Sequence, residues 1–115
     1  MAERYDLRID QGSDKKLTLI FKDSEKHVLN LTGYKAFMQA RIHPAVQEVV
    51  MELSTENGLI VITPLQGKLD ISFPKEMTSS IRAAKYYYDL ELVSDEETVR
   101  VIEGHLTITP EVTRV

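Results

Sequence analysis

The chain has 115 residues, the length of one domain, and no linker or change of composition divides it. Hydrophobic residues make up 43% and charged residues 28%, which excludes collagen-like, disordered and membrane classes. The absence of cysteine excludes disulfides, thiolate nucleophiles and cysteine-based zinc sites, and the net charge of -4 gives no attraction to nucleic acid or anionic membranes. We therefore expect one domain over 1–115 with neither nucleic-acid nor membrane partners.

Alternating apolar and polar residues, the pattern of strands that bury one face, dominate the chain. Eight segments follow this pattern: 5–9, 17–21, 36–42, 49–53, 59–63, 69–73, 86–92 and 99–109. The first two segments, joined by a turn-rich stretch at 11–14, are expected to form a hairpin or to be neighbours in one sheet. Asn57-Gly58 predicts a tight turn between the fourth and fifth segments, because both residues tolerate positive φ.

Residues 74–82 are the only segment that reads as a helix, of one or two turns, because Met77 and Ile81 lie four apart on one face. Eight short strands spaced by about ten residues, with one short helix, predict an all-β fold of two packed antiparallel sheets. A small closed barrel is the alternative architecture. Residues 111–115 follow the last strand as a short tail.

The last predicted strand changes phase part of the way along. Val99 and Val101 alternate in one phase, whereas Ile102, Leu106 and Ile108 alternate in the other. One additional residue in a strand moves every following side chain to the opposite face of the sheet. We therefore predict a β-bulge near 102–104, where Gly104 suits the bend.

No residue pattern in the chain matches a catalytic, cofactor or metal site. The three histidines, His27, His43 and His105, lack the short spacings of metal ligands. Asp10 and Asp14 lie in a turn without the full calcium-loop pattern. The chain also lacks a Gly-x-Ser-x-Gly elbow and a glycine-rich phosphate loop. We interpret the protein as a non-enzyme with no cofactor.

Three large apolar side chains are expected on the faces opposite the core: Ile20, Phe37 and Tyr87. Apolar side chains gathered on an outer sheet face mark a site where a partner docks, so these residues are the candidate protein interface. Burial of these strands on both faces is the other explanation. A carbohydrate- or other ligand-binding module is the alternative function, although only Tyr87 of the three consecutive tyrosines is free to stack on a sugar.

Several segments, in order along most of the chain, resemble small tail-associated proteins of tailed phages and prophages. The clearest is Leu31–Arg41, which reads LTGYKAFMQAR. The others are Glu52–Gly58, Tyr88–Leu92, Glu103-Gly104 and Pro110–Arg114. The same segments are similar, more loosely, to the N-terminal immunoglobulin-like domain of phage baseplate upper proteins, which anchors receptor-binding machinery to the baseplate.

The resemblance implies an immunoglobulin-like β-sandwich that serves as a structural part of a tailed-phage virion, in the tail, baseplate or fibre. Its partners would be other phage structural proteins, with possible formation of a homo-oligomer. The N-terminal residues lack the apolar core of a secretion signal, so we expect folding in the host cytoplasm and then incorporation into the virion. The resemblance implies no catalytic residues.

Overall fold

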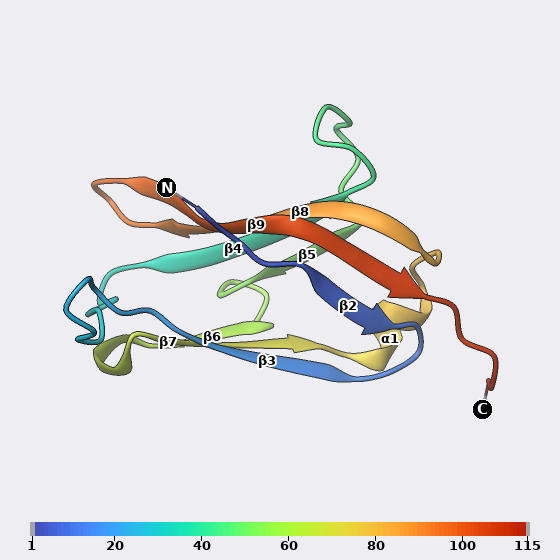
Figure 1. Ribbon diagram of the computed structural model, residues 1–115, viewed down its shortest axis with the longest axis horizontal. Coiled ribbons are helices and arrows are strands. Elements are labelled where there is room, and N and C mark those ends of the chain that lie inside the picture. The colour runs from blue at the N-terminus through green and yellow to red at the C-terminus, as the bar shows by residue number, and fades with distance from the viewer. Residues whose placement is uncertain (1, 115) are drawn as a thin grey trace.

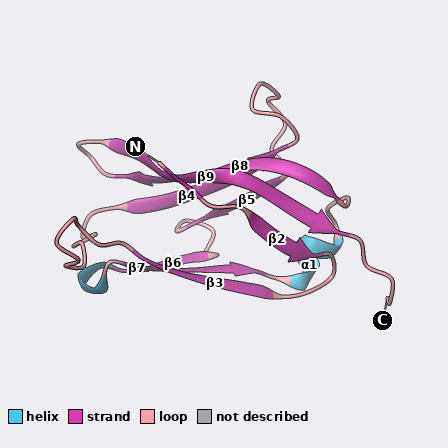
Figure 2. Ribbon diagram, in the orientation of Figure 1, coloured by secondary structure: helices cyan, strands magenta, loops and turns pink. Residues whose placement is uncertain are grey.

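Two β-sheets pack face to face in the computed structural model, which describes residues 2–114 (Figure 1). The larger sheet contains β1 (Glu3–Arg4), β2 (Leu7–Asp10), β4 (Lys35–Arg41), β5 (Met51–Ser54), β8 (Ala84–Val93) and β9 (Thr98–Thr109). The smaller sheet contains β3 (Lys15–Ile20), β6 (Ile60–Thr63) and β7 (Lys68–Phe73). The helical segments are short, the 3-10 turn η1 (Pro64–Gln66) and α1 (Lys75–Ser79), and lie in connections between strands (Figure 2). The predicted helix is thus confirmed as a single short one.

The strand order confirms an immunoglobulin-like sandwich. The larger sheet runs β1–β9–β8–β4–β5, with β2 also beside β9, and the smaller sheet runs β3–β7–β6. Immunoglobulin domains place their second, fourth and fifth strands in one sheet and their third, sixth and seventh in the other; an added strand after the third is a common variation. When β1 and β2 count as the first strand and β5 as the added strand, this chain follows that scheme, except that its first strand lies beside the seventh, β9, and not in the sheet of the second. The two sheets form separate layers, so the alternative of a closed barrel is excluded.

A second feature of immunoglobulin-like domains lies at the start of β8. The Tyr86 hydroxyl donates a hydrogen bond to the Arg82 carbonyl, four residues upstream, at 2.6 Å. Such a bond at the entry to this strand is the tyrosine corner of immunoglobulin-like domains. It holds the connection that follows α1 against the sheet, and Ile81 in that connection is buried.

The core lies between the sheets and is built from the alternating positions that the sequence predicts. Phe73, Leu69 and Ile71 of β7 are almost completely buried, and they face Met38, Leu90 and Leu106 of the larger sheet's strands. The side chains between them in sequence point outward and stay accessible. Burial of each large apolar side chain stabilises the fold by about 1.5–3 kcal/mol, so this double layer is the main stabilising element.

The predicted pairing of the first two segments is wrong. β2 pairs in parallel with β9 in the larger sheet, whereas β3 pairs antiparallel with β7 in the smaller one. The turn between them crosses from one sheet to the other because α1 holds it there. The Gly12 amide donates to Thr78 Oγ1 at 3.1 Å, and the Lys75 amide donates to Asp14 Oδ1 at 2.8 Å.

The predicted β-bulge is present, one residue earlier than expected. Leu90 pairs with Ile102 but the next residue, Glu91, pairs with Arg100, so Val101 is the additional residue. Gly104 has a different role from the predicted bend. A side chain there would collide with the Tyr5 carbonyl, which packs directly on the Gly104 backbone where the first strand is interrupted at residues 5–6.

Gly104→Ala tests this close approach. The added methyl group would push the Tyr5 backbone away from β9, and overpacking of this kind costs about 1–3 kcal/mol of unfolding free energy. Urea unfolding measures the loss, and hydrogen exchange follows the Tyr5 amide, which donates to the Glu103 carbonyl. Gly58→Ala is the control. The φ of 82° at Gly58 makes this substitution costly in unfolding free energy, but no atom lies near the added Cβ. The Tyr5 amide should therefore stay protected in this variant. Unchanged stability and protection in Gly104→Ala would contradict the packing.

Candidate functional site

A shallow groove of about 640 Å³ lies on the outer face of the larger sheet. The loop between β4 and β5, residues 42–50, projects from this sheet and forms one wall through Pro44 (Figure 1). The floor consists of outward side chains of neighbouring strands: Arg4, Phe37, Gln39, Arg41, Tyr87, Asp89, Glu91, Arg100 and Glu103. A pocket of this size falls within the usual range of ligand sites, but the open face of a sheet also suits a protein surface.

The central arginine of the groove is paired with two carboxylates. Arg100 Nε lies 3.2 Å from Asp89 Oδ2, and Arg100 Nη1 lies 3.1 Å from Glu103 Oε1. The hydrogen bond to Glu103, together with the Asp89 charge, raises the pKa of the Arg100 guanidinium. Beside them, Gln39 Nε2 donates to Glu52 Oε2 at 2.7 Å. In the middle of the groove, these bonds thus join β8 to β9 and β4 to β5.

Arg41, the last residue of β4, holds the projecting loop. Its Nη1 donates to the carbonyls of Val46, at 3.0 Å, and Gln47, and its Nη2 donates to Gln39 Oε1 at 2.8 Å. All three acceptors are neutral. The guanidinium charge therefore stays uncompensated by any carboxylate within ion-pair distance in residues 2–114.

Tyr87 stands between two histidines at the same end of the groove. Its ring centroid lies 4.8 Å from that of His105 on β9 and 5.8 Å from that of His43 on the projecting loop, both edge to face. Edge-to-face packing positions the ring while 40% of the residue stays exposed. His43 and His105 lack the short sequence spacing of metal ligands, but the fold brings them together around Tyr87.

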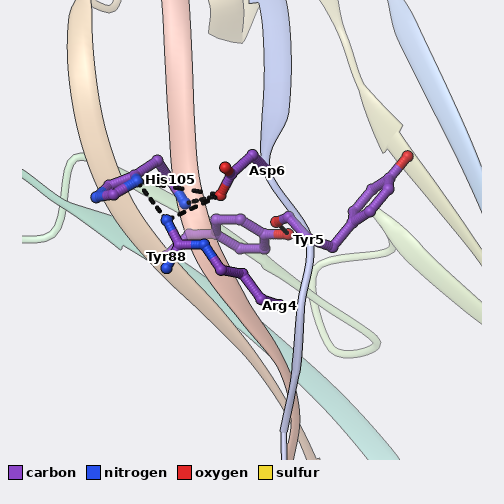
Figure 3. A network of polar contacts seen from close by, with 5 residues as sticks. All are labelled: Arg4, Tyr5, Asp6, Tyr88 and His105. Atoms are coloured by element: carbon purple, nitrogen blue, oxygen red, sulfur yellow. Dashed lines mark hydrogen bonds and ion pairs between the residues drawn. The ribbon is translucent and has the colours of Figure 1, made fainter.

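A polar network joins the N-terminal segment to the edge of the groove (Figure 3). Arg4 Nη2 lies 2.7 Å from His105 Nδ1 and 3.3 Å from Asp6 Oδ1. The backbone amide of His105 donates to Asp6 Oδ1 at 2.9 Å, and this bond lowers the pKa of the Asp6 carboxyl. Beneath them the Tyr88 hydroxyl donates to the Tyr5 carbonyl, and burial raises the pKa of that hydroxyl. The two residues of β1 and these polar contacts hold the N-terminal segment against β9.

The predicted interface residues fall on two different faces. Phe37 and Tyr87 both line the groove, on the neighbouring strands β4 and β8. Ile20, 54% exposed, lies on β3 and therefore on the outer face of the smaller sheet. The three do not form one patch. No pattern in the sequence indicates a role for Arg41, Asp89 or Arg100, although the alternation places the first two on the outer face with Phe37 and Tyr87.

One cluster of potential metal ligands occurs in the described part of the chain. Asp23, Glu25 and His27 are exposed in the loop after β3, with ligand atoms within 4.8 Å of one another. Asp23 Oδ1 already accepts hydrogen bonds from the amides of Glu25 and His27 at 2.9 Å each. These bonds form a local turn, which accounts for the closeness of the three side chains.

The aspartates of the first turn are also structural. Asp10 Oδ1 accepts from Thr109 Oγ1 at 2.7 Å, and Asp14 Oδ1 accepts from the Lys75 amide. Their carboxylates therefore join the turn to β9 and to α1.

Comparison with known proteins finds no protein-family model that matches the chain. A search of curated proteins likewise returns no match. Among residues 2–114, no helix has the length and apolar character needed to span a membrane.

Asp6→Asn tests the N-terminal network through its pH dependence. Because folding lowers the pKa of Asp6, the carboxylate stabilises the fold fully above its ordinary pKa of 3.8, and this contribution is lost as the pH falls below that value. The free energy of unfolding in urea should therefore fall more steeply with acidification for the wild type than for Asp6→Asn. Asp95→Asn, in an exposed turn, controls for the loss of one negative charge. Parallel pH profiles for the wild type and Asp6→Asn would contradict the role of this bond.

Proposed function

We propose that this domain is a protein-docking module of a tailed-phage virion, and that it docks through the groove on its larger sheet. Two observations support the proposal. The chain resembles tail-associated phage proteins over several ordered segments, and its fold is an immunoglobulin-like sandwich, the architecture that this resemblance implies. A virion part of this kind works by contact with neighbouring proteins rather than by chemistry.

The observation that carries the choice of surface is the pair of aromatic side chains in the groove. Phe37 and Tyr87 lie four residue pairs apart on the adjacent strands β4 and β8, with arginines and carboxylates around them. Interfaces concentrate binding energy in aromatic and arginine residues at their centre, with a polar rim around them. Tyrosine and phenylalanine supply a large contact area with only two side-chain torsions to order, so little entropy is lost on docking.

A carbohydrate-binding module is the second candidate, and the exposed Tyr87 is the feature that favours it. Sugar sites use an aromatic face together with free hydrogen-bond groups. In the groove, the Arg100 and Arg41 guanidiniums and the Gln39 amide already bond to neighbouring side chains or carbonyls. Fewer groups are left for a sugar than for a protein surface that brings its own complementary residues.

Substitution of the aromatic pair tests the docking role. Phe37→Ser and Tyr87→Ser should each reduce the amount of this protein in particles purified from the host that encodes it, because truncating a buried interface aromatic often costs about 2 kcal/mol or more of binding free energy. Immunodetection against a major virion protein measures the amount. Ile20→Ser, an equally apolar change on the opposite sheet, is the matched control.

Circular dichroism of each purified variant must first show the wild-type β spectrum, so that loss of docking is separated from loss of fold. Equal incorporation of all three variants would contradict docking through the groove. Absence of the wild-type protein from purified particles would contradict the virion role itself. If the wild-type protein is absent from particles and binds a glycan array in a way that depends on Tyr87, the carbohydrate alternative is favoured.

A further inference from the structure

The Asn57 side chain closes the free edge of the larger sheet at β5. In an antiparallel pair, residues that bond to the neighbouring strand alternate with residues whose amide and carbonyl point away from it. The Thr55 amide bonds to the Ala36 carbonyl of β4, so the backbone groups of Glu52 and Ser54 point away from β4. The Ser54 amide donates to Asn57 Oδ1, and Asn57 Nδ2 donates to the Glu52 carbonyl, both at 3.0 Å. The carboxamide thus bonds to this edge as the peptide group of a further strand would.

This closure depends on the side-chain nitrogen of Asn57. Unpaired backbone groups at a sheet edge are a template for pairing with another chain, and the carboxamide covers two of them. An ionised carboxylate only accepts hydrogen bonds, so at position 57 it would lose the bond to the Glu52 carbonyl and present a negative oxygen to it. Loss of this one nitrogen would therefore leave the edge of β5 open at Glu52.

The residue after Asn57 is Gly58, which offers an unhindered backbone nitrogen. Beyond its two chain neighbours, no atom lies within 4 Å of the position that a Cβ of Gly58 would take. Its amide forms no hydrogen bond with any residue from 2 to 114. Both residues are exposed, so water reaches them. The Gly58 nitrogen is thus free to attack the side-chain carbonyl carbon of Asn57.

Such an attack releases ammonia and then consumes water. The Gly58 nitrogen forms a bond to Asn57 Cγ and gives up its proton, while the bond from Cγ to Nδ2 breaks and ammonia leaves. The product is a cyclic succinimide. Water adds to one of the two ring carbonyls, and opening of the ring gives aspartate or isoaspartate at position 57. Either product carries a carboxylate in place of the carboxamide.

Two backbone amides favour the attack. Asn57 Oδ1 accepts from the Ser54 amide at 3.0 Å and from the Leu59 amide at 3.1 Å. This oxygen gains negative charge when the nitrogen adds to Cγ, and amide donors that are already in place stabilise such a charge. The bond from Leu59 also folds the side chain back along Gly58, as in an Asx turn.

Asn30, the other asparagine of the chain, lacks these conditions. Its Oδ1 accepts from the Thr32 amide at 3.0 Å, so its side chain forms a similar turn. The next residue is Leu31, which is buried and whose amide donates to the Pro64 carbonyl at 3.0 Å. The nitrogen that would attack at Asn30 is therefore held in another bond and shielded by its side chain.

We propose that Asn57 is a deamidation site, and that its conversion to aspartate or isoaspartate opens the edge of β5 at Glu52. The proposal goes beyond the docking function and does not depend on it, because neither Asn57 nor β5 lines the groove. An aged molecule then differs from a fresh one by an added negative charge and by a free carbonyl on the sheet edge.

Peptide mapping by mass spectrometry tests the modification. The folded chain is incubated in mildly alkaline buffer at growth temperature, and deamidation is followed at both asparagines. Asn57 should react about tenfold or more faster than Asn30, because glycine leaves the attacking nitrogen unhindered. Gly58→Ala is the matched control, and its methyl group should slow deamidation at Asn57 by about tenfold or more.

NMR spectroscopy tests the opened edge. The deamidated fraction is separated by anion exchange through its added charge and compared with Asn57→Asp. In both, the resonance of the Glu52 carbonyl carbon should shift upfield, because this carbonyl loses its hydrogen bond. Asn30→Asp, the same change at the other asparagine, is the control and should leave the Glu52 resonance in place.

Preferential deamidation of Asn57 together with the upfield shift supports the proposal. Deamidation no faster at Asn57 than at Asn30 in the folded chain overturns it. A Glu52 resonance that stays in place in the deamidated fraction also overturns it, and this measurement decides the question even where Asn57→Asp does not fold.

Discussion

One additional residue in β9, Val101, determines which side chains of that strand reach the core and which reach the groove. Beyond it, Ile102, Leu106 and Ile108 point inward and are nearly inaccessible to solvent. Without the bulge, the alternation would turn the charged Glu103 and the imidazole of His105 toward the core. An unpaired buried charge is far more costly than any contact it could make there, so the bulged register is strongly favoured.

The same register assembles the groove. It places Glu103 beside Asp89 and His105 beside Tyr87 on the outer face, where the paired strands β8 and β9 meet. It also brings Gly104 opposite Tyr88, at the point where the N-terminal segment crosses closest to the sheet. The buried Tyr88 hydroxyl reaches the Tyr5 carbonyl through that gap. Core packing, the groove and the attachment of the first strand therefore depend on one irregularity.

Much of the fold could be predicted from the sequence, because half-buried strands leave a period-two pattern that few other structures produce. The change of phase between Val101 and Ile102 was sufficient to predict the bulge, although not its exact residue. The partner of the first strand could not be predicted in the same way. Its Leu7 and Ile9 fit a core face in either sheet, and the choice depends on bonds from the turn at 11–14 to α1, which join residues more than 60 positions apart.

The candidate site was only partly visible in the sequence, for a related reason. Alternation indicates that Phe37 and Tyr87 face away from the core, but strand order decides whether outward residues share a face. Ile20 has the same local pattern and lies on the other sheet. Arg41 looks like an ordinary surface residue until the structure shows that, within residues 2–114, its guanidinium bonds only to neutral oxygens.

The most direct measurement asks which face of the domain is covered in the assembled particle. The chain contains no cysteine, so a single introduced one reports its own accessibility to a maleimide. Glu91→Cys marks the groove, and Val61→Cys, at a position 56% exposed on the smaller sheet, marks the opposite face. Docking through the groove predicts that Cys at 91 reacts in the free, dilute domain and is protected in particles, while Cys at 61 reacts in both. Equal reactivity of the two positions in particles would contradict it.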